Sequence, residues 1–291
     1  MRAGSGGRAI GPVVRASDAL VIGGGDIVNP SSAATRYWER TYLRRPVFVA
    51  GVGVPTWGSS SAEAVERLGM FLRHPAVRSI GTRDEASARW IRETLCPSAP
   101  ITVAPDLVCA LRLPVVERPS DPPVFGVAVR RRSGRDDLTQ VRLLCERAIS
   151  LGYRLRRIVL ATGRTRVRDL GATRELGFED TELVSSDDLD VITRAIGECT
   201  AMASMKFHGV VVAAMYGVPA FVIMPTAKNR RFMEEIGRPD LVSVYNDPTL
   251  PGRLTRDPQP IPEDVRLRLR EGAETYLRDL RAQVLEVAAG R

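Results

Sequence analysis

The amino-acid sequence predicts an α/β protein made of two Rossmann-like halves. Short apolar runs alternate with helix-like segments along most of the 291 residues, and several of the runs end in glycines or in a charged residue. Strand, loop, helix and strand in this order are typical of a doubly wound parallel sheet. Because a chain of this length is often divided between two cores, we expect one half in residues 1–118 and the other in residues 119–291.

The first half contains four apolar runs that are typical of buried strands, at 18–25, 44–55, 77–84 and 101–108. Residues 59–75 have the pattern of an amphipathic helix, and serines near its start can cap the first turn. A second helix is predicted at 84–95. The segment 111–123 is rich in proline and has mixed charge, so we expect it to link the halves.

The second half repeats this order. Strands are predicted at 122–129, 153–162, 200–204 and 220–225, and helices at 136–152 and 185–199. A long helix at 262–290 closes this half, and its apolar positions keep helical spacing: Val265, Leu269, Leu277, Leu280 and Val284. Since ligands of such sheets bind at the carboxyl ends of the strands, we expect the site in the cleft between the halves.

Several functional classes are disfavoured by composition. No apolar run reaches the roughly 18 residues of a membrane-spanning helix, and the first residues lack the apolar core of a signal peptide. The four cysteines form no CxxC pair, and no DxD-like pair lies in a glycine-flanked loop. We therefore expect no metal, no cofactor, no disulfide framework and a cytoplasmic location.

The net charge of +8 is unevenly distributed, because residues 130–168 contain twelve arginines. Such a segment attracts anions, including phosphorylated metabolites and acidic lipid headgroups. Peripheral contact with the anionic inner face of a membrane is therefore an open expectation. Aromatic residues make up only 5% of the chain and none alternates with these arginines, so we expect no nucleic-acid partner.

The segment 204–225 is the strongest candidate for an active site. It has the pattern of a loop, a helix of small residues that ends at Gly217, and a buried strand. The loop carries Lys206, one of only two lysines, and His208, one of only two histidines. Ser204 can cap the helix, whose amides and dipole then favour an anion in front of them. The dipole disfavours a protonated His208 until a phosphate binds, so this histidine could gain a proton with the substrate.

Other candidates follow predicted strands. Arg130 ends the strand at 122–129, where its guanidinium could hold a carboxylate or phosphate with two hydrogen bonds. Gly24, Gly25 and Asp26 follow the first strand, but their sequence is not the dinucleotide motif GxGxxG. Ligand contact and a tight turn both remain open for these glycines.

Two further polar residues have alternative interpretations. Arg83 could face the cleft, although an ion pair with Asp84 at the start of a helix is the favoured interpretation. Asp106 follows the fourth apolar run, where it could either stabilise its loop or bind a substrate hydroxyl. His74 lies in a polar turn, and we expect a structural role for it.

These blocks together resemble the polysaccharide pyruvyl transferase family. The resemblance runs from about Asp18 to Gly237 and is most specific in the segment SMKFHGVVVAAMYGVPAFVI. It implies a fold like that of the metal-independent GT-B glycosyltransferases. The opening strand and glycine-Asn turn usual in the family are missing, so the N-terminal half is expected to be truncated, either because the gene start is misplaced or because the acceptor-side domain is reduced.

The resemblance also implies roles for individual residues. His208 matches the catalytic histidine of the family, and Arg130 matches an arginine expected to hold the donor. Lys206 stands where the family usually has arginine, which keeps the charge but loses the planar fork. Lys228 matches a common lysine after the last strand, and Ser204 completes the expected donor site.

The implied reaction moves a pyruvyl group from phosphoenolpyruvate to a sugar of a polysaccharide or lipid-linked glycan and forms a cyclic ketal. Such a reaction belongs to exopolysaccharide or cell-wall glycan biosynthesis. Two alternatives remain open: a GT-B-type glycosyltransferase that uses a sugar nucleotide, and an inactive relative that binds a glycan or a partner.

Overall fold

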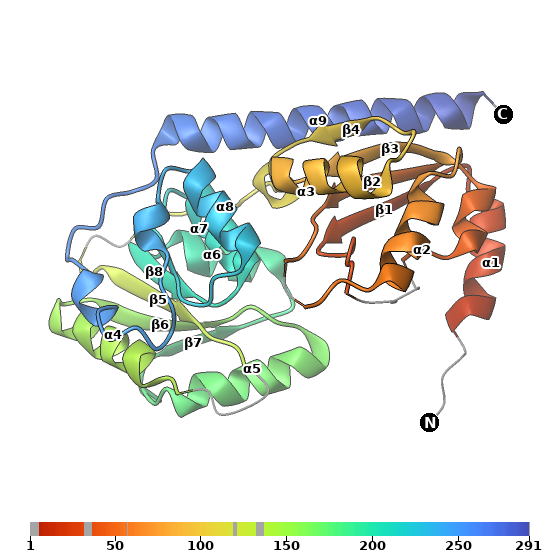
Figure 1. The fold of residues 1–291 in the computed structure, drawn as a ribbon. Coiled ribbons are helices and arrows are strands. Elements are labelled where there is room, and N and C mark those ends of the chain that lie inside the picture. The colour runs from red at the N-terminus through yellow and green to blue at the C-terminus, as the bar shows by residue number, and fades with distance from the viewer. Residues whose placement is uncertain (1–5, 32–36, 57, 119–120, 132–136, 291) are drawn as a thin grey trace. The chain divides into compact units, whose positions relative to one another are not determined.

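The computed structural model describes residues 6–31, 37–56, 58–118, 121–131 and 137–290. The chain forms two compact units (Figure 1). Unit 1 comprises Met1–Ala110 together with Leu269–Arg291, and unit 2 comprises Leu111–Arg268. The division therefore falls eight residues before the expected boundary at 118/119, and the last part of the chain returns to the first unit.

Unit 1 is built on a parallel sheet of four strands in the order β1-β2-β3-β4. The strands are β1 (Leu20–Gly25), β2 (Val47–Val52), β3 (Val77–Thr82) and β4 (Ile101–Val103). They are joined by η1 (Arg40–Arg44), α2 (Ala62–Leu72) and α3 (Glu85–Trp90), which continues as the π-helical turn η2 (Ile91–Leu95). The predicted serine cap is confirmed, since Ser61 accepts a hydrogen bond from the amide of Ala64.

The two faces of this sheet have different covers. Val47 and Val49 of β2 pack in one core with residues of α2 and η2. Phe48 and Ala50 point to the other face, where they pack against Leu280 of the long helix α9 (Glu263–Ala289). Parallel sheets need both faces covered, and here the connections between successive strands run along one face only.

The last helix therefore has a different place from the one expected. We predicted that it closes the second half, but residues from 269 onward belong to unit 1 and only its first turns to unit 2. Tyr276 seats the helix on Gly81 of β3, because a Cβ at Gly81 would lie 1.9 Å from the Tyr276 hydroxyl oxygen. Burial raises the pKa of Tyr276 to about 12.

Unit 2 contains a parallel sheet of five strands in the order β7-β6-β5-β8-β9. Its strands are β5 (Val124–Ala128), β6 (Arg154–Val159), β7 (Glu182–Ser185), β8 (Ala201–Ser204) and β9 (Ala220–Val222). Its helices are α4 (Thr139–Ser150), α5 (Gly163–Glu175), α6 (Leu189–Gly197), α7 (Phe207–Met215) and α8 (Ala227–Glu235). Helices α4 and α5 cover one face, and α6 and α7 cover the other (Figure 1).

Among the α-helices and strands of the described residues, four were absent from the sequence prediction: α1 (Gly6–Ala16), α5, α8 and β7. Helix α1 contains Pro12 and several glycines, which disguise its pattern. Helix α5 is dominated by arginine and other polar residues. Strand β7 is a short edge strand with alternating exposure and has no continuous apolar run.

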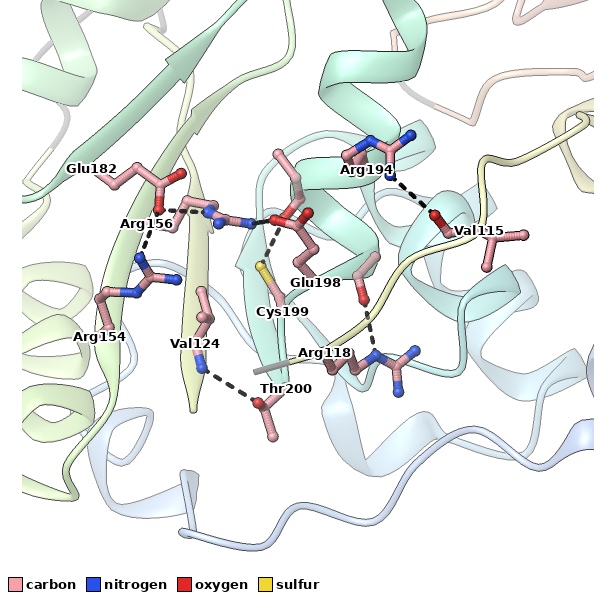
Figure 2. Close-up of polar contacts among 12 residues, drawn as sticks. Val115, Arg118, Val124, Arg154, Arg156, Glu182, Arg194, Glu198, Cys199 and Thr200 are labelled. Carbon is pink, nitrogen blue, oxygen red and sulfur yellow. Dashed lines mark hydrogen bonds and ion pairs between the residues drawn. The ribbon is translucent and has the colours of Figure 1, made fainter. Parts of the chain in front are cut away.

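The segment 111–118, predicted to link the halves, is bound to unit 2. The Arg118 guanidinium donates hydrogen bonds to the carbonyls of Gly197 and Tyr216. Arg194 of α6 donates to the Val115 carbonyl over 3.0 Å, as Figure 2 shows. Unit 2 thus includes the start of the predicted linker.

Figure 2 also shows a buried charge network in unit 2. Arg156 of β6 lies between Glu182 of β7 at 2.9 Å and Glu198 at 2.8 Å. Burial alone would lower the pKa of Arg156, but hydrogen bonds to the two glutamates and the nearby Cys199 raise it above the ordinary value. A buried guanidinium of this kind needs its partners.

Some of the arginines of 130–168 have partners within the fold. Besides Arg156, Arg157 is buried and donates to the carbonyls of Glu179 and Thr181. Arg131 and Arg166 form ion pairs with Glu175 and Asp187. Within the described residues, Arg156 and Arg157 are therefore used inside the fold. The exposed arginines in the described part of this segment are Arg131, Arg142, Arg147, Arg154, Arg164 and Arg168. No helix in the described part of the chain is long and apolar enough to cross a membrane.

The contact between Gly81 and Tyr276 generates a prediction. Gly81→Ala should destabilise unit 1 by about 2 kcal/mol, because the added methyl group overpacks the buried tyrosine. All three tryptophans lie in residues 1–110, so urea unfolding followed by tryptophan fluorescence reports on this unit.

Gly11→Ala is the matched control. Its new Cβ would meet only the end of the Arg15 side chain at 3.5 Å, so stability should stay the same or rise slightly, as for a helical glycine replaced by alanine. Equal unfolding midpoints for the two variants would contradict the proposed seating of α9.

Candidate active site

The candidate site lies where the order of strands reverses in unit 2. Strands β5 and β8 are neighbours, with Ala128 and Ser204 as register partners at their carboxyl ends. The chain continues from β5 to α4 on one face and from β8 to α7 on the other. Ligands of doubly wound sheets bind at such a switch point. The segment that carries Arg130 and the segment that carries Lys206 and His208 therefore both begin at the same edge of the sheet.

The turn between β8 and α7 differs from the expected one. The Ser204 hydroxyl accepts a hydrogen bond from the Lys206 amide and donates one to the Lys206 carbonyl, both over 3.0 Å. Lys206, not Ser204, occupies the N-cap position, and its side chain makes no capping hydrogen bond. The predicted serine cap is therefore wrong: fully buried Ser204 shapes the turn. The positive end of the α7 dipole still points to this edge of the sheet.

Helix α7 packs closely on the sheet at its first turn. A Cβ at Gly209 would lie 2.4 Å from a Leu160 methyl carbon and 2.8 Å from the Ser204 hydroxyl. Glycine is therefore required for the helix to begin this near to β8. The preceding residue, His208, is exposed.

Lys228 comes to the same helix start from α8. Its Nζ lies 5.2 Å from the centre of the Phe207 ring, within the range of a cation–π contact. Phe207 also packs against His208, at 5.5 Å between ring centres, and edge-on against Phe232 of α8. Lys228 and His208 therefore both lie beside the Phe207 ring.

Lys206 is held by a residue that the sequence did not indicate. Its Nζ lies 2.6 Å from Oδ2 of Asp169 in α5, and the Asp169 side chain is only 2% exposed. Asp169 shares a buried face of α5 with Ala172 and Thr173. An acidic residue at a core-facing position of a helix is the signal that could have revealed it. The positive charge of Lys206 is thus anchored to Asp169 and is not mobile.

Arg130 lies two residues beyond β5 and is half-buried. Its amide donates to the Met205 sulfur over 3.5 Å, which ties it to the β8 turn. Its Nε is buried and has no hydrogen-bond partner among the described residues. A buried donor without a partner is costly, and an anionic ligand at the switch point would satisfy it.

The unit 1 candidates Asp26 and Arg83 form an ion pair with each other. They follow β1 and β3, and Gly53 after β2 lies between them, because its Cβ would be 2.5 Å from an Arg83 nitrogen. Arg83 thus forms an ion pair with Asp26, a residue that the sequence analysis did not pair with it. Asp84 caps α3 by accepting from the Ser87 amide over 2.7 Å.

The remaining candidates are distributed over turns of unit 1. Gly24 and Gly25 both have positive φ, and a Cβ on either would meet nothing within 4 Å. Asp106 is buried and accepts from the Val108 amide, so it stabilises its loop. His74 accepts from the Ala76 amide within a turn, as expected. No group of three potential His, Cys, Asp or Glu metal ligands is present in the described part of the chain.

Comparisons with known proteins identify a family and a fold for this chain. A family model for polysaccharide pyruvyl transferase matches residues 5–226. No curated protein matches the chain. A putative UDP-N-acetylglucosamine 2-epimerase of Listeria monocytogenes is similar in structure, with a TM-score of 0.59 and 13% identity over 96% of this chain and 77% of that one.

Two other solved structures are similar. The UDP-GlcNAc 2-epimerase of Methanocaldococcus jannaschii, in complex with UDP-GlcNAc and UDP, gives a TM-score of 0.58 and 11% identity over 94% of this chain and 79% of that one. UGT73P12 of Glycyrrhiza uralensis gives a TM-score of 0.53 and 9% identity over 97% of this chain and 77% of that one. At these identities the similarity shows the fold alone, which is the Rossmann-like α/β fold of GT-B glycosyltransferases and epimerases.

The Asp26–Arg83 pair generates a prediction about stability. Arg83→Met should lower the free energy of unfolding of unit 1 by about 3 kcal/mol, because it leaves a largely buried carboxylate without its cation. Arg67→Met removes an exposed pair with Glu63 and should cost less than about 1 kcal/mol. Tryptophan fluorescence during urea unfolding measures both. Equal losses of unfolding free energy in the two variants would show that the Asp26–Arg83 pair stabilises unit 1 no more than an exposed ion pair does.

Proposed function

The chain belongs to the polysaccharide pyruvyl transferase family, and we propose that it transfers a pyruvyl group from phosphoenolpyruvate to a sugar of a polysaccharide or lipid-linked glycan. The product would be a cyclic pyruvate ketal, and the second product inorganic phosphate. The donor would bind in unit 2 at the switch point between β5 and β8.

The observation that carries this proposal is the position of Arg130, whose buried Nε has no hydrogen-bond partner among the described residues, beside the turn that leads into α7. Phosphoenolpyruvate is a compact trianion, and its removal from water requires cationic groups or oriented dipoles around it. Arg130, Lys206 and Lys228 supply positive charge at or near this edge. The start of α7 adds the positive end of a helix dipole.

His208 is the proposed proton donor. It is exposed in the first turn of α7, where a bound donor could meet it. Transfer of its proton to the methylene carbon of the donor would leave a cationic centre at C2, which one sugar hydroxyl attacks. The C2–O bond to phosphate then breaks, and a second hydroxyl closes the ketal. Of the two hydroxyl protons released, one restores the histidine and the other leaves with phosphate.

The acceptor would involve unit 1. Among its candidates, Asp26, Arg83 and Asp106 already have partners within the fold. Gly24 and Gly25 have open space where side chains would stand, so a sugar could approach this backbone closely. We therefore propose the carboxyl end of β1 as the acceptor contact.

The second candidate function is that of a GT-B-type glycosyltransferase, which the shared fold with UDP-sugar enzymes favours. Ligand binding separates the two. Phosphoenolpyruvate at about 100 times its Kd should stabilise the folded protein by about 2.7 kcal/mol and raise the melting temperature. UDP-GlcNAc should not. The opposite result would favour the glycosyltransferase, and no shift with either ligand would favour an inactive glycan-binding relative.

His208→Ala should reduce phosphate release from phosphoenolpyruvate in the presence of a glycan acceptor by about 10² to 10⁴-fold, the usual contribution of general acid catalysis. The melting shift with phosphoenolpyruvate should persist, because the cations remain. His74→Ala, at the other histidine, should retain wild-type turnover. Near wild-type turnover of His208→Ala would remove the assigned role of this histidine.

A further inference from the structure

Asp169 joins the two loops that leave the switch point. Its Oδ1 accepts a hydrogen bond from the Arg131 amide over 3.1 Å, in the segment after β5. Its Oδ2 lies 2.6 Å from the Lys206 Nζ, at the start of α7. The residue itself is 1% exposed. One buried carboxylate on α5 therefore contacts the neighbour of Arg130 on one side and Lys206 on the other.

We propose that Asp169 is a positioning residue for the donor site, an inference that rests on the proposed function. It would fix the Lys206 ammonium and, through the Arg131 backbone, the segment that carries Arg130. The Lys206 ammonium and the Arg130 guanidinium would then be in position before phosphoenolpyruvate binds, ready to contact its carboxylate and phosphate.

The chemistry of the pair allows this double duty. A lysine ammonium has three donors, so the contact with Asp169 leaves two of them for a ligand. A free lysine side chain loses considerable rotamer entropy when it binds a ligand. A lysine that is already anchored within the fold avoids this loss at the binding step. This matters at Lys206 because a lysine lacks the planar fork with which an arginine fixes itself on an anion.

Helix α5 is a suitable anchor for these contacts. The Arg131 side chain forms an ion pair with Glu175, also on α5, so two interactions hold this residue against the helix. Asp169 is also tied within α5, where the Thr173 hydroxyl donates to its carbonyl over 2.8 Å. A buried carboxylate requires compensation. Here Oδ1 accepts a hydrogen bond from the Arg131 amide, and Oδ2 has the ion pair with Lys206 but no hydrogen-bond partner among the described residues.

The first experiment tests the anchor without any donor. The chain has only two lysines, so acylation by a small N-hydroxysuccinimide ester followed by peptide mapping gives one rate for each. In the wild-type protein, Lys206 should react more slowly than Lys228. Asp169→Asn should raise the Lys206 rate several-fold and leave the Lys228 rate unchanged. Equal rates for both lysines in the wild type would overturn the anchor even if the variant folded poorly.

The second experiment tests positioning by a double-mutant cycle with phosphoenolpyruvate as the probe, measured by calorimetry on the full chain. Asp169→Asn and Lys206→Met should each weaken binding, Lys206→Met by about tenfold, equal to about 1.4 kcal/mol. The double variant should lose less affinity than the sum of the two single losses, because Asp169 acts partly through the lysine. Strictly additive losses would overturn the inference and indicate a general structural role.

Asp187→Asn is the control, since it removes an exposed carboxylate that pairs with Arg166 of α5, the helix that also carries Asp169. Its phosphoenolpyruvate affinity should equal that of the wild type. Failure of the wild-type protein to bind phosphoenolpyruvate would instead reject the proposed function, and the labelling experiment would then decide the anchor by itself.

Discussion

The candidate site depends on the parallel pairing of β5 with β8. This pairing sets Ala128 opposite Ser204, and because the two strands continue to opposite faces of the sheet, the loops after them diverge and leave an edge between them. The β8 turn then adds its own constraints: Ser204 closes the turn through Lys206, and Gly209 lets α7 start close to the sheet. Arg130, Lys206 and His208 thus follow from one strand alignment.

Buried charge is the second theme of the structure. An arginine-rich chain must place some guanidinium groups inside, and each of these requires acceptors. Arg156 has two glutamates, Arg157 has backbone carbonyls, and Arg83 has Asp26. Arg156, Arg157 and Arg266, like Arg130, have a buried Nε without a hydrogen-bond partner among the described residues. Arg130 differs in its place at the switch point of the sheet, where a ligand could supply the missing acceptor.

The sequence predicted most strands and helices of both halves, because apolar runs and helical periodicity are local properties. It located His208 at a helix start and Arg130 just after a strand. It did not predict α5 and β7, whose polar composition hides their pattern, and it therefore missed Asp169. It also assigned Ser204 to the helix cap and Arg83 to Asp84. Several partners are compatible with such polar residues, and only the packed chain selects one.

The sequence by itself determined the fold class and the segment that carries His208, since both follow from the order of short local patterns. Tertiary structure alone decided which residues meet. The helical spacing of α9 shows that one of its faces is buried, but not that unit 1 supplies the sheet that covers it. Likewise, Asp169 and Lys206 are 37 residues apart in the chain, and their contact exists only because α5 and the β8 turn meet at the same sheet edge.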